Sequence, residues 1–458
     1  MRNTNPTFSA LIFAASASFW GGCREVAAQP EIVSSPELRS SRADGEMRPV
    51  QTIDPRTVLP RVDASRGALE RPAALRRFFD SLLALETGAA TEDVSILQFG
   101  DSHTAADLGT AVVRKAFAAR FGDGGRGFVS FGLPWSSFRQ EGVRGGMSKD
   151  WVAERPKYVT KRERTATDAR HGLLGFSIAT TRAGAQAWTD VSVPFERFEL
   201  HFLTQPSGGT FDVFVDDARV GTLHTKSKRI ESAFHAVDVP SGPHKIEVRA
   251  YGDGEVRVFG VTLDRRVAGT TFDALGINGA RASELLRSDE AHFAEQLRRR
   301  NPALVVLAYG TNESGDDTPS DVYERTIVDA LGRISRAVPT ASCLLLGPPD
   351  RAIETKDGWL TSPKLMDVMA AQKRVAEAAG CAYYSQFDAM GGEGSLAAWS
   401  LEDPPRGGKD RVHLTRDGYA QLGASVSADL LRAYEAYRSD RLARAGALPP
   451  ITAPMPLK

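Results

Sequence analysis

The sequence has no excess of charge of either sign. Its 458 residues include 57 lysines and arginines and 57 aspartates and glutamates, so the formal net charge is zero at pH 7. A protein that binds nucleic acid through the phosphates normally has a basic excess, so no nucleic-acid partner is expected. Apolar residues make up 42% of the chain and charged residues 25%, as in ordinary globular proteins.

Several enzyme signatures are also missing or misplaced. No G-x-S-x-G segment occurs, so the α/β-hydrolase family is not indicated. No clustered metal-ligand spacing is present, and neither a metal nor an organic cofactor is expected. GDGGRG (122–127) fits G-x-G-x-x-G, but it follows a predicted helix instead of a strand, which argues against a dinucleotide site.

An apolar run lies at the N-terminus and is too short to cross a bilayer. The run FSALIFAASASFW (8–20) follows Arg2 and leads into Gly21-Gly22-Cys23. These features are typical of a secretory signal, so residues 1–23 are predicted to direct export. Two small residues before Cys23 resemble the bacterial lipobox, in which the cysteine is lipidated. The alternative is a plain signal peptide, with Cys23 removed.

Lipidation would anchor the protein to a membrane. Arg24 stands where many Gram-negative bacteria use an acidic residue to retain lipoproteins at the inner membrane. The expected location is therefore the periplasm or the outer membrane of a Gram-negative bacterium. Cys343 and Cys381 are the other two cysteines. An exported protein can pair them, and two buried free thiols are the alternative.

Composition and the spacing of apolar residues divide the rest of the chain into segments. Residues 24–72 are rich in Ser, Pro, Arg and Glu and are predicted to be a flexible tether, and the Pro-rich residues 443–458 an unordered tail. Residues 73–150 and 266–442 alternate apolar strands with amphipathic helices, which predicts an α/β domain whose parallel sheet is covered on both faces. Residues 151–265 alternate at period two and predict an inserted antiparallel β-sandwich.

Four polar blocks follow predicted strands or precede the last helix. They are GDSH (100–103), INGA (277–280), YGTNE (309–313) and DRVHLT (410–415). Ligands of open α/β sheets bind at the carboxyl ends of the strands, so we expect the four blocks to meet there.

Together the blocks supply the parts of a serine esterase. Ser102 can act as nucleophile if His413 is its base and Asp410 orients the imidazole. The amides of Ser102 and Gly279 and the side chain of Asn312 can hold an oxyanion. Each residue alone has an ordinary alternative, since Ser102 can cap a helix and Asn312 a turn. Their coincidence at one sheet edge favours catalysis.

The four blocks resemble those of the SGNH/GDSL hydrolase family, over roughly residues 92–145 and 266–440. His103 stands where many members carry Leu. The resemblance implies a three-layer α/β/α fold with a flavodoxin-like parallel sheet, a nucleophile at Ser102, an acid and a base at Asp410 and His413, and oxyanion donors at Gly279 and Asn312.

Within that family, GDSH followed by FGDGGRGF, YGTNE and an inserted β-rich module is similar to the peptidoglycan O-acetylesterases. These exported bacterial enzymes remove acetate from the C6 hydroxyl of muramic acid. The similarity implies an acetylated glycan substrate and a carbohydrate-binding-like insertion. Trp188 in that insertion is a candidate for stacking on a sugar ring, although it can equally close the edge of the sandwich.

Three alternatives remain open. The protein can be an esterase of another acetylated polysaccharide. It can be a glycan O-acetyltransferase, which shares the acyl-enzyme and passes the acetyl group to a sugar hydroxyl. It can also be a glycan-binding lipoprotein with a vestigial triad.

Overall fold

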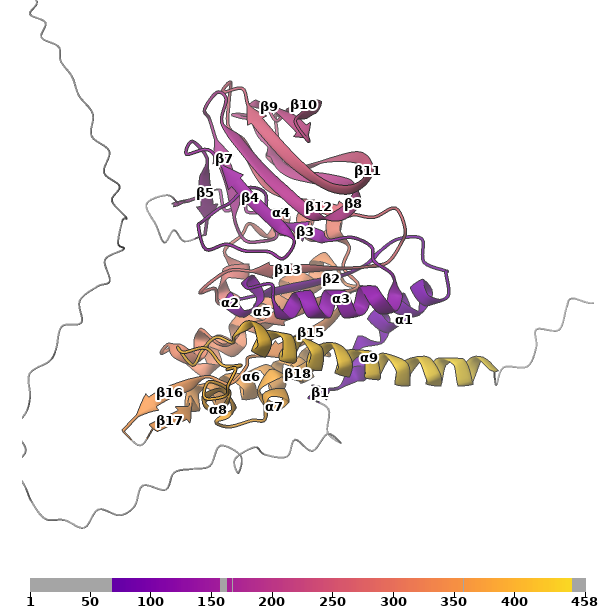
Figure 1. Cartoon of the computed structure of the whole chain (residues 1–458), viewed down its shortest axis with the longest axis vertical. Coiled ribbons are helices and arrows are strands. Elements are labelled where there is room, and N and C mark those ends of the chain that lie inside the picture. The colour runs from indigo at the N-terminus through magenta and orange to yellow at the C-terminus, as the bar shows by residue number, and fades with distance from the viewer. Residues whose placement is uncertain (1–67, 157–162, 167, 357, 447–458) are drawn as a thin grey trace, which may run out of the picture. The chain divides into compact units, whose positions relative to one another are not determined.

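A six-stranded sheet forms the centre of the catalytic part of the chain. The computed structural model describes residues 68–156, 163–166, 168–356 and 358–446. The sheet has the order β1-β18-β15-β14-β2-β13 (Figure 1). Its strands are β1 (Leu69–Glu70), β2 (Val94–Gly100), β13 (Thr270–Gly276), β14 (Leu304–Ala308), β15 (Ser342–Gly347) and β18 (Ala382–Ser385).

The topology is flavodoxin-like. All neighbouring strands of this sheet are parallel except β1, which pairs with β18 in antiparallel fashion. Counted along the chain, the five parallel strands therefore lie in the order 2-1-3-4-5. The predicted sheet is confirmed, and its topological switch point lies between β2 and β14.

Helices cover both faces of the sheet. Within β2, Ile96 joins one hydrophobic cluster, whereas Leu97 and Phe99 join another, because successive strand residues point to opposite faces. The first cluster includes side chains of α1 (Arg76–Glu86), α3 (Gly109–Phe121) and α9 (Arg416–Gly446). The second includes side chains of α4 (Glu290–Arg300), α5 (Ser320–Ala337) and α6 (Pro363–Ala379). The three-layer arrangement is therefore confirmed.

The folded part extends further at both ends than the composition and periodicity of the sequence predict. Leu69 pairs with Tyr384, and a 3-10 helix, η1, begins at Pro72, both within the expected tether. At the other end α9 continues to Gly446, past residue 442. A two-residue strand has no periodicity to detect, which is why composition alone placed this boundary too late. Cys23 and the expected signal peptide lie outside the described residues.

The chain between β2 and β13 forms a second sheet of ten strands, nearly all antiparallel. They are β3 (Gly127–Val129), β4 (Val143–Met147), β5 (Val152–Arg155), β6 (Glu163–Thr165), β7 (Ser177–Thr180), β8 (Gln186–Thr204), β9 (Thr210–Val215), β10 (Ala218–His224), β11 (Glu231–Ala250) and β12 (Val256–Asp264). β8 and β11 are the longest strands of this sheet and pair with each other, with a shift of register around Gly242. The expected sandwich is thus one continuous sheet around its own hydrophobic core.

This inserted sheet lies along the free edge of β13. Strands β3 and β4 already pair with it, although both precede residue 151, where the insertion was expected to begin. The Phe128 amide donates to the Asp273 carboxylate at 2.8 Å, and Arg300 of α4 binds the same carboxylate at 2.7 Å. An open strand edge can pair with other chains, and the insertion prevents that here. The loop around Gly175 also reaches Ile277, near the carboxyl end of β13.

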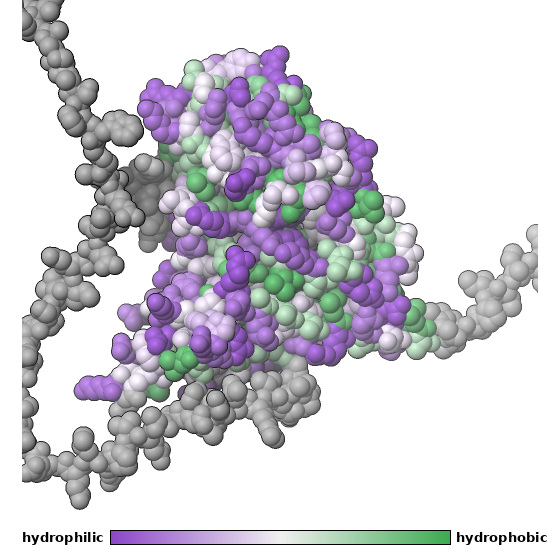
Figure 2. Space-filling view, viewed as in Figure 1, coloured by the Kyte–Doolittle hydropathy of each residue, from purple (hydrophilic) through white to green (hydrophobic). Residues whose placement is uncertain are grey.

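The face of the described part seen in Figure 2 mixes polar and apolar side chains. Within that part, no helix is both long enough and apolar enough to span a bilayer.

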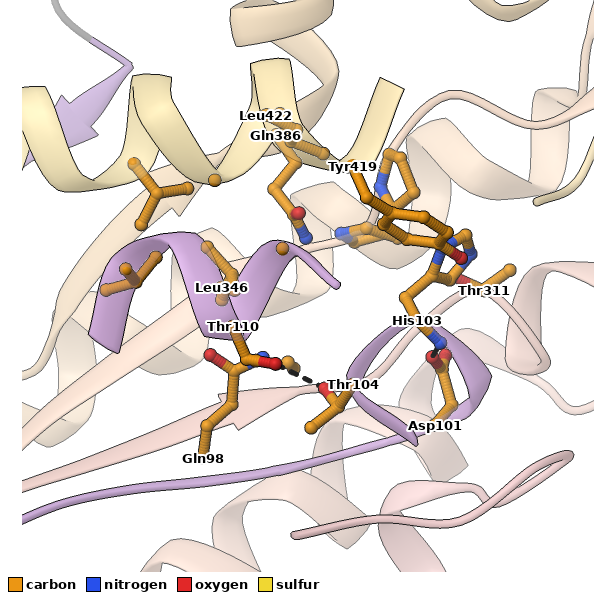
Figure 3. A pocket seen from close by; sticks show the side chains of 17 residues that line it. Gln98, Asp101, His103, Thr104, Thr110, Thr311, Leu346, Gln386, Tyr419 and Leu422 are labelled. Atoms are coloured by element: carbon orange, nitrogen blue, oxygen red, sulfur yellow. Dashed lines mark hydrogen bonds between the residues drawn. The ribbon is translucent and has the colours of Figure 1, made fainter. Parts of the chain in front are cut away.

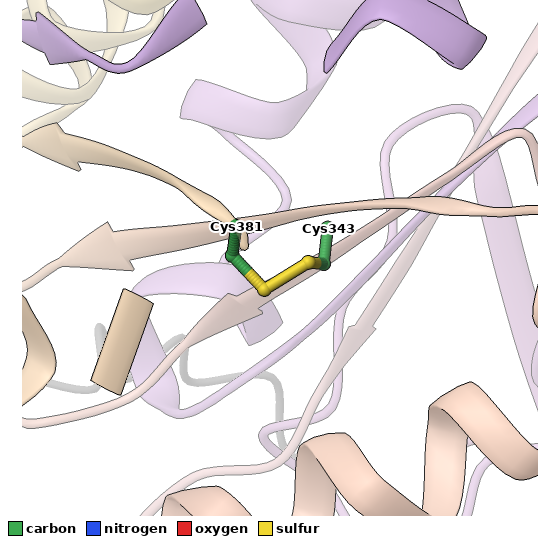
Figure 4. The surroundings of a disulfide bond; sticks show 2 residues. All are labelled: Cys343 and Cys381. Atoms are coloured by element: carbon green, nitrogen blue, oxygen red, sulfur yellow. A yellow bond between two sulfur atoms is a disulfide. The ribbon is translucent and has the colours of Figure 1, made fainter. Parts of the chain in front are cut away.

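A disulfide joins two neighbouring parallel strands (Figure 4). Cys343 of β15 and Cys381, just before β18, are bonded with a Cα–Cα distance of 4.9 Å. The sequence left pairing and free thiols open, and the structure shows pairing. The bond closes a loop with a sequence separation of 38 residues, which contains α6.

We expect Cys343→Ser to lower the free energy of unfolding. A loop of this length corresponds to about 4 kcal/mol of unfolded-state entropy. Chemical denaturation of the oxidised wild type should therefore require more denaturant than that of the variant. The double variant Cys343→Ala, Cys381→Ala is the control, because it lacks both the disulfide and the free Cys381 thiol that the single variant leaves. Addition of a reductant should destabilise only the wild type, and equal stability of all oxidised forms would refute the prediction.

Candidate active site

Ser102, His413 and Asp410 form one hydrogen-bonded chain. Ser102 Oγ lies 2.8 Å from His413 Nε2, and His413 Nδ1 lies 2.6 Å from Asp410 Oδ2. The other oxygen of Asp410 accepts the His413 amide at 3.0 Å. These are ordinary hydrogen-bond distances in the order nucleophile, base and acid. The fold thus brings together residues that are 311 positions apart in the sequence.

Gly100 allows the nucleophile helix to lie close to the sheet. The short helix α2 (Ser102–Ala105) begins two residues after it, directly at the end of β2. A Cβ atom on Gly100 would lie 2.8 Å from the Ala308 carbonyl oxygen and even closer to Thr104. Asp101 caps the helix by accepting the His103 amide at 2.9 Å. Ser102 is consequently the first residue of a helix at the switch point of the sheet.

Asp107 fixes the turn between α2 and α3. Its φ of 48° is unusual for a residue with a side chain. Its carboxylate accepts hydrogen bonds from Thr110 at 2.7 Å, from Arg126 at 2.5 Å and from the Glu141 amide at 2.8 Å. Burial alone would raise the pKa of Asp107, but Arg114 and Arg126 lower it below its usual value. Arg126 comes from GDGGRG, so this motif supports the nucleophile helix.

Two backbone amides near Ser102, at the carboxyl ends of the strands, donate no hydrogen bond within the described residues. Gly279 has a φ of 75°, which favours glycine, and a Cβ there would meet nothing within 4 Å. Neither its amide nor that of Ser102 donates a hydrogen bond within the described residues. Asn312 donates one side-chain N–H to the Ala280 carbonyl at 2.9 Å, so its second N–H remains available. This arrangement suits an oxyanion, which needs preorganised donors.

Glu313 connects the second and third blocks. One of its oxygens accepts the Ala282 amide at 2.9 Å, and the other accepts the Gly310 amide at 3.1 Å. Burial raises the pKa of this carboxyl despite these bonds. The sequence predicts no role for Glu313, and its only signal there is its position directly after Asn312.

The pKa of Asp410, the candidate acid, lies below its usual value. Burial alone would raise the pKa of Asp410, but the His413 side chain and the amides of His413 and Val412 lower it below its usual value. An ionised Asp410 carboxylate favours the imidazole tautomer with its proton on Nδ1, which leaves Nε2 free to accept the proton of Ser102.

A small cavity with both polar and apolar lining lies beside α2, between α3 and α9 (Figure 3). Tyr419 Oη and His103 Nδ1, which both line it, are 3.0 Å apart. Burial lowers the pKa of His103 to about 3, and proximity to His413 contributes, so His103 is neutral at pH 7. Burial raises the pKa of Asp101 to about 7. Asp101 Oδ2 and His103 Nε2 have no hydrogen-bond partner among the described atoms.

Asp101 should make the protein less stable as the pH rises. Because its folded pKa of about 7 exceeds the ordinary value of 3.8, the folded state binds a proton that the unfolded chain releases between these values. We expect Asp101→Asn, which keeps the acceptor for the His103 amide, to have similar stability at pH 4 and greater stability than wild type at pH 8. Urea denaturation at both pH values measures this.

The comparison variant is Asp410→Asn. The folded pKa of Asp410 is lowered, so its contribution to stability is present above its unfolded pKa and is lost at lower pH. Asp410→Asn should therefore destabilise the protein at pH 8. If Asp101→Asn is also less stable than wild type at pH 8, Asp101 is a net stabilising group and the prediction is wrong.

Trp188, the remaining candidate among the described residues, lies in the inserted sheet. Trp188 is in β8, between Gly146 of β4 and Glu247 of β11 and half-buried against Gly146, so it belongs to the inserted sheet. Its role in sugar binding stays a prediction. Among the described residues, no three or more His, Cys, Asp or Glu side chains lie together in a way that could hold a metal ion.

Comparison with known families identifies the α/β domain. Residues 242–421 match the family model of the GDSL-like lipase/acylhydrolases. The chain carries an SGNH-type GDSL acylhydrolase domain. The match covers the second, third and last blocks, while GDSH lies before it because the inserted sheet separates β2 from β13. The protein is accordingly a carboxylic ester hydrolase.

The fold recurs in a solved structure. A peptidoglycan O-acetylesterase superposes with a TM-score of 0.67 and 23% identity, over 81% of this chain and 100% of that one. A family two carbohydrate esterase from Cellvibrio japonicus has 12% identity and a TM-score of only 0.27, over 64% of this chain and 98% of its own. No protein of curated function matches the sequence significantly.

Proposed function

We propose that this SGNH hydrolase removes O-acetyl groups from a carbohydrate by way of an acyl-enzyme on Ser102. The hydrogen-bonded chain from Ser102 through His413 to Asp410, beside two unengaged amides, is the observation that carries the proposal. A vestigial site would have no reason to retain all three residues in this geometry.

The proposed reaction has two halves. His413 Nε2 takes the proton of Ser102 as Oγ attacks the acetyl carbonyl carbon, and the Ser102 and Gly279 amides and Asn312 bind the oxyanion. The imidazolium then protonates the departing sugar oxygen, which leaves acetyl-Ser102. Water, deprotonated by His413, attacks this ester in the second half, and acetate and free Ser102 result. The Asp410 carboxylate stabilises the imidazolium in both halves.

Ser102→Ala should abolish ester hydrolysis and leave the fold intact. Loss of one triad member typically costs on the order of 10³-fold or more in kcat. Hydrolysis of an aryl acetate measures the loss, and circular dichroism checks the fold. Ser425→Ala is the matched control for a lost serine hydroxyl, because Ser425 lies in α9 and its hydroxyl donates to the Gln421 carbonyl at 3.1 Å. A Ser102→Ala protein that keeps most of its turnover would exclude this nucleophile.

We propose peptidoglycan as the glycan. The support is the likeness of fold to a peptidoglycan O-acetylesterase, together with the inserted sheet. Acetate release from O-acetylated peptidoglycan should exceed release from acetylated xylan at equal acetyl concentration. The reverse preference would assign the protein to another polysaccharide. Transfer of acetyl to an added chito-oligosaccharide, with little free acetate, would favour an O-acetyltransferase.

We propose that the protein is exported and lipidated at Cys23. The Cys343–Cys381 disulfide supports an oxidising compartment, because such bonds are rare in the cytosol. Fractionation of a Gram-negative host should place wild type in the outer membrane, and Cys23→Ser in the soluble periplasmic or external fraction. If exported wild type is already soluble, the lipid anchor is wrong and the hydrolase assignment is unaffected.

A further inference from the structure

A hairpin follows β15 on the way to α6. Its strands β16 (Ala352–Thr355) and β17 (Gly358–Thr361) are antiparallel and carry labels at the lower left of Figure 1. The base of the hairpin is fixed, since Ala352 and Thr361 are buried and Thr361 Oγ1 donates to Asp350 at 2.8 Å. The other described residues of the hairpin are largely exposed.

This hairpin contacts the loop that carries the triad acid and base. The Ala352 amide donates to the Arg411 carbonyl at 3.1 Å, and the Arg411 guanidinium lies 4.1 Å from the centre of the Trp359 ring. Arg411 directly follows Asp410 and precedes His413 by two residues. Its φ of 52° is unusual for a side-chain-bearing residue, so these contacts hold the loop in a conformation it would not favour alone.

Trp359 is unusual among the described tryptophans. It is the most exposed of them at 36%, whereas Trp135 and Trp188 are half-buried and Trp151 and Trp399 are buried at 3% and 4%. A partly exposed indole beside the candidate catalytic loop has ring surface that a ligand can contact. Cation–π contact with Arg411 orients the ring and leaves part of its surface open.

The two sides of the hairpin differ. Trp359 pairs across the hairpin with Glu354, and Leu360 pairs with Ile353. Because neighbouring strand residues point to opposite sides, the exposed Leu360 and Ile353 face away from Trp359. The side on which Arg411 lies therefore offers an aromatic ring with polar neighbours. That chemistry fits a sugar, whose C–H face lies on the ring while its hydroxyls reach polar groups, better than it fits an aliphatic chain.

We infer that Trp359 stacks on a sugar ring of the substrate next to the residue that carries the acetyl group. This inference rests on the proposed glycan esterase function. It assigns substrate recognition in the α/β domain to the hairpin, separately from the inserted sheet. It also makes the substrate an oligomer of at least two sugars, because the ring on Trp359 and the acetyl group at Ser102 occupy different places.

The test compares a polymer with a small ester. For Trp359→Ala we expect kcat/KM on O-acetylated glycan to fall about tenfold or more relative to kcat/KM on an aryl acetate, mostly through KM. Trp359→Tyr should keep most of the activity on glycan, because a flat ring remains. Leu360→Ala, on the other side of the same hairpin, is the matched control and should leave the ratio unchanged.

The outcomes separate this inference from the proposed function. Equal losses on both esters in Trp359→Ala would make the indole a support for the Arg411 loop and overturn the inference, as would no loss on either. If wild type acts on acetylated xylan and not on peptidoglycan, peptidoglycan is wrong as substrate and the same ratio is measured on xylan. If wild type cleaves the aryl acetate but no acetylated glycan, both the glycan function and the inference fail.

Discussion

The site depends on the pairing of β2 with a parallel neighbour on each side. β13 and β14 both align with β2 so that Gly276 and Ala308 lie opposite Gly100. The polar blocks that follow these three strands therefore start at the same level of the sheet. Their proximity results from backbone hydrogen bonds in the ladder, which tolerate little change in register.

Close contact between the backbones of α2 and β14 then positions the residues at these strand ends. Gly100 lets α2 lie against the end of β14, and the carbonyl of Gly100 accepts the Ile277 amide at 3.1 Å. Buried carboxylates complete the arrangement, with Asp107 behind the nucleophile helix and Glu313 between the oxyanion loops. Breaking such a buried pairing is costly, because a charge or polar group is left without a partner. The proposed nucleophile, Ser102, is thus positioned partly by buried carboxylates outside the Ser102–His413–Asp410 chain.

The sequence predicted what depends on local pattern. Apolar runs indicated the parallel strands, and amphipathic spacing indicated the helices. The polar blocks indicated Ser102, His413 and Asp410, which the structure brings together. Relations between distant segments were not predictable in this way. Period-two alternation identified strands in the insertion, but it says nothing of which strand pairs with which, so the strand order of this sheet was not predictable.

Side-chain partners were also hidden from sequence. Nothing in the sequence distinguishes Glu313 from other acidic residues, because its partner, the Ala282 amide, is 31 residues away in the chain. The pairing of Cys343 with Cys381 needed the order of β15 and β18, since two apolar strands with one cysteine each are equally compatible with free thiols.

The position of the inserted sheet has a consequence for how the chain folds. The strand before Ser102 and its neighbour β13 are separated in sequence by the whole insertion, yet the insertion's two ends meet where the Arg265 amide donates to the Gly124 carbonyl at 2.8 Å. While unfolded, a loop of this length adds about 3 kcal/mol of closure entropy over a loop of a few residues. Once folded, it behaves as a short connection. Folding of the insertion should thus precede docking of β13, and the esterase site would be among the last parts of the chain to form.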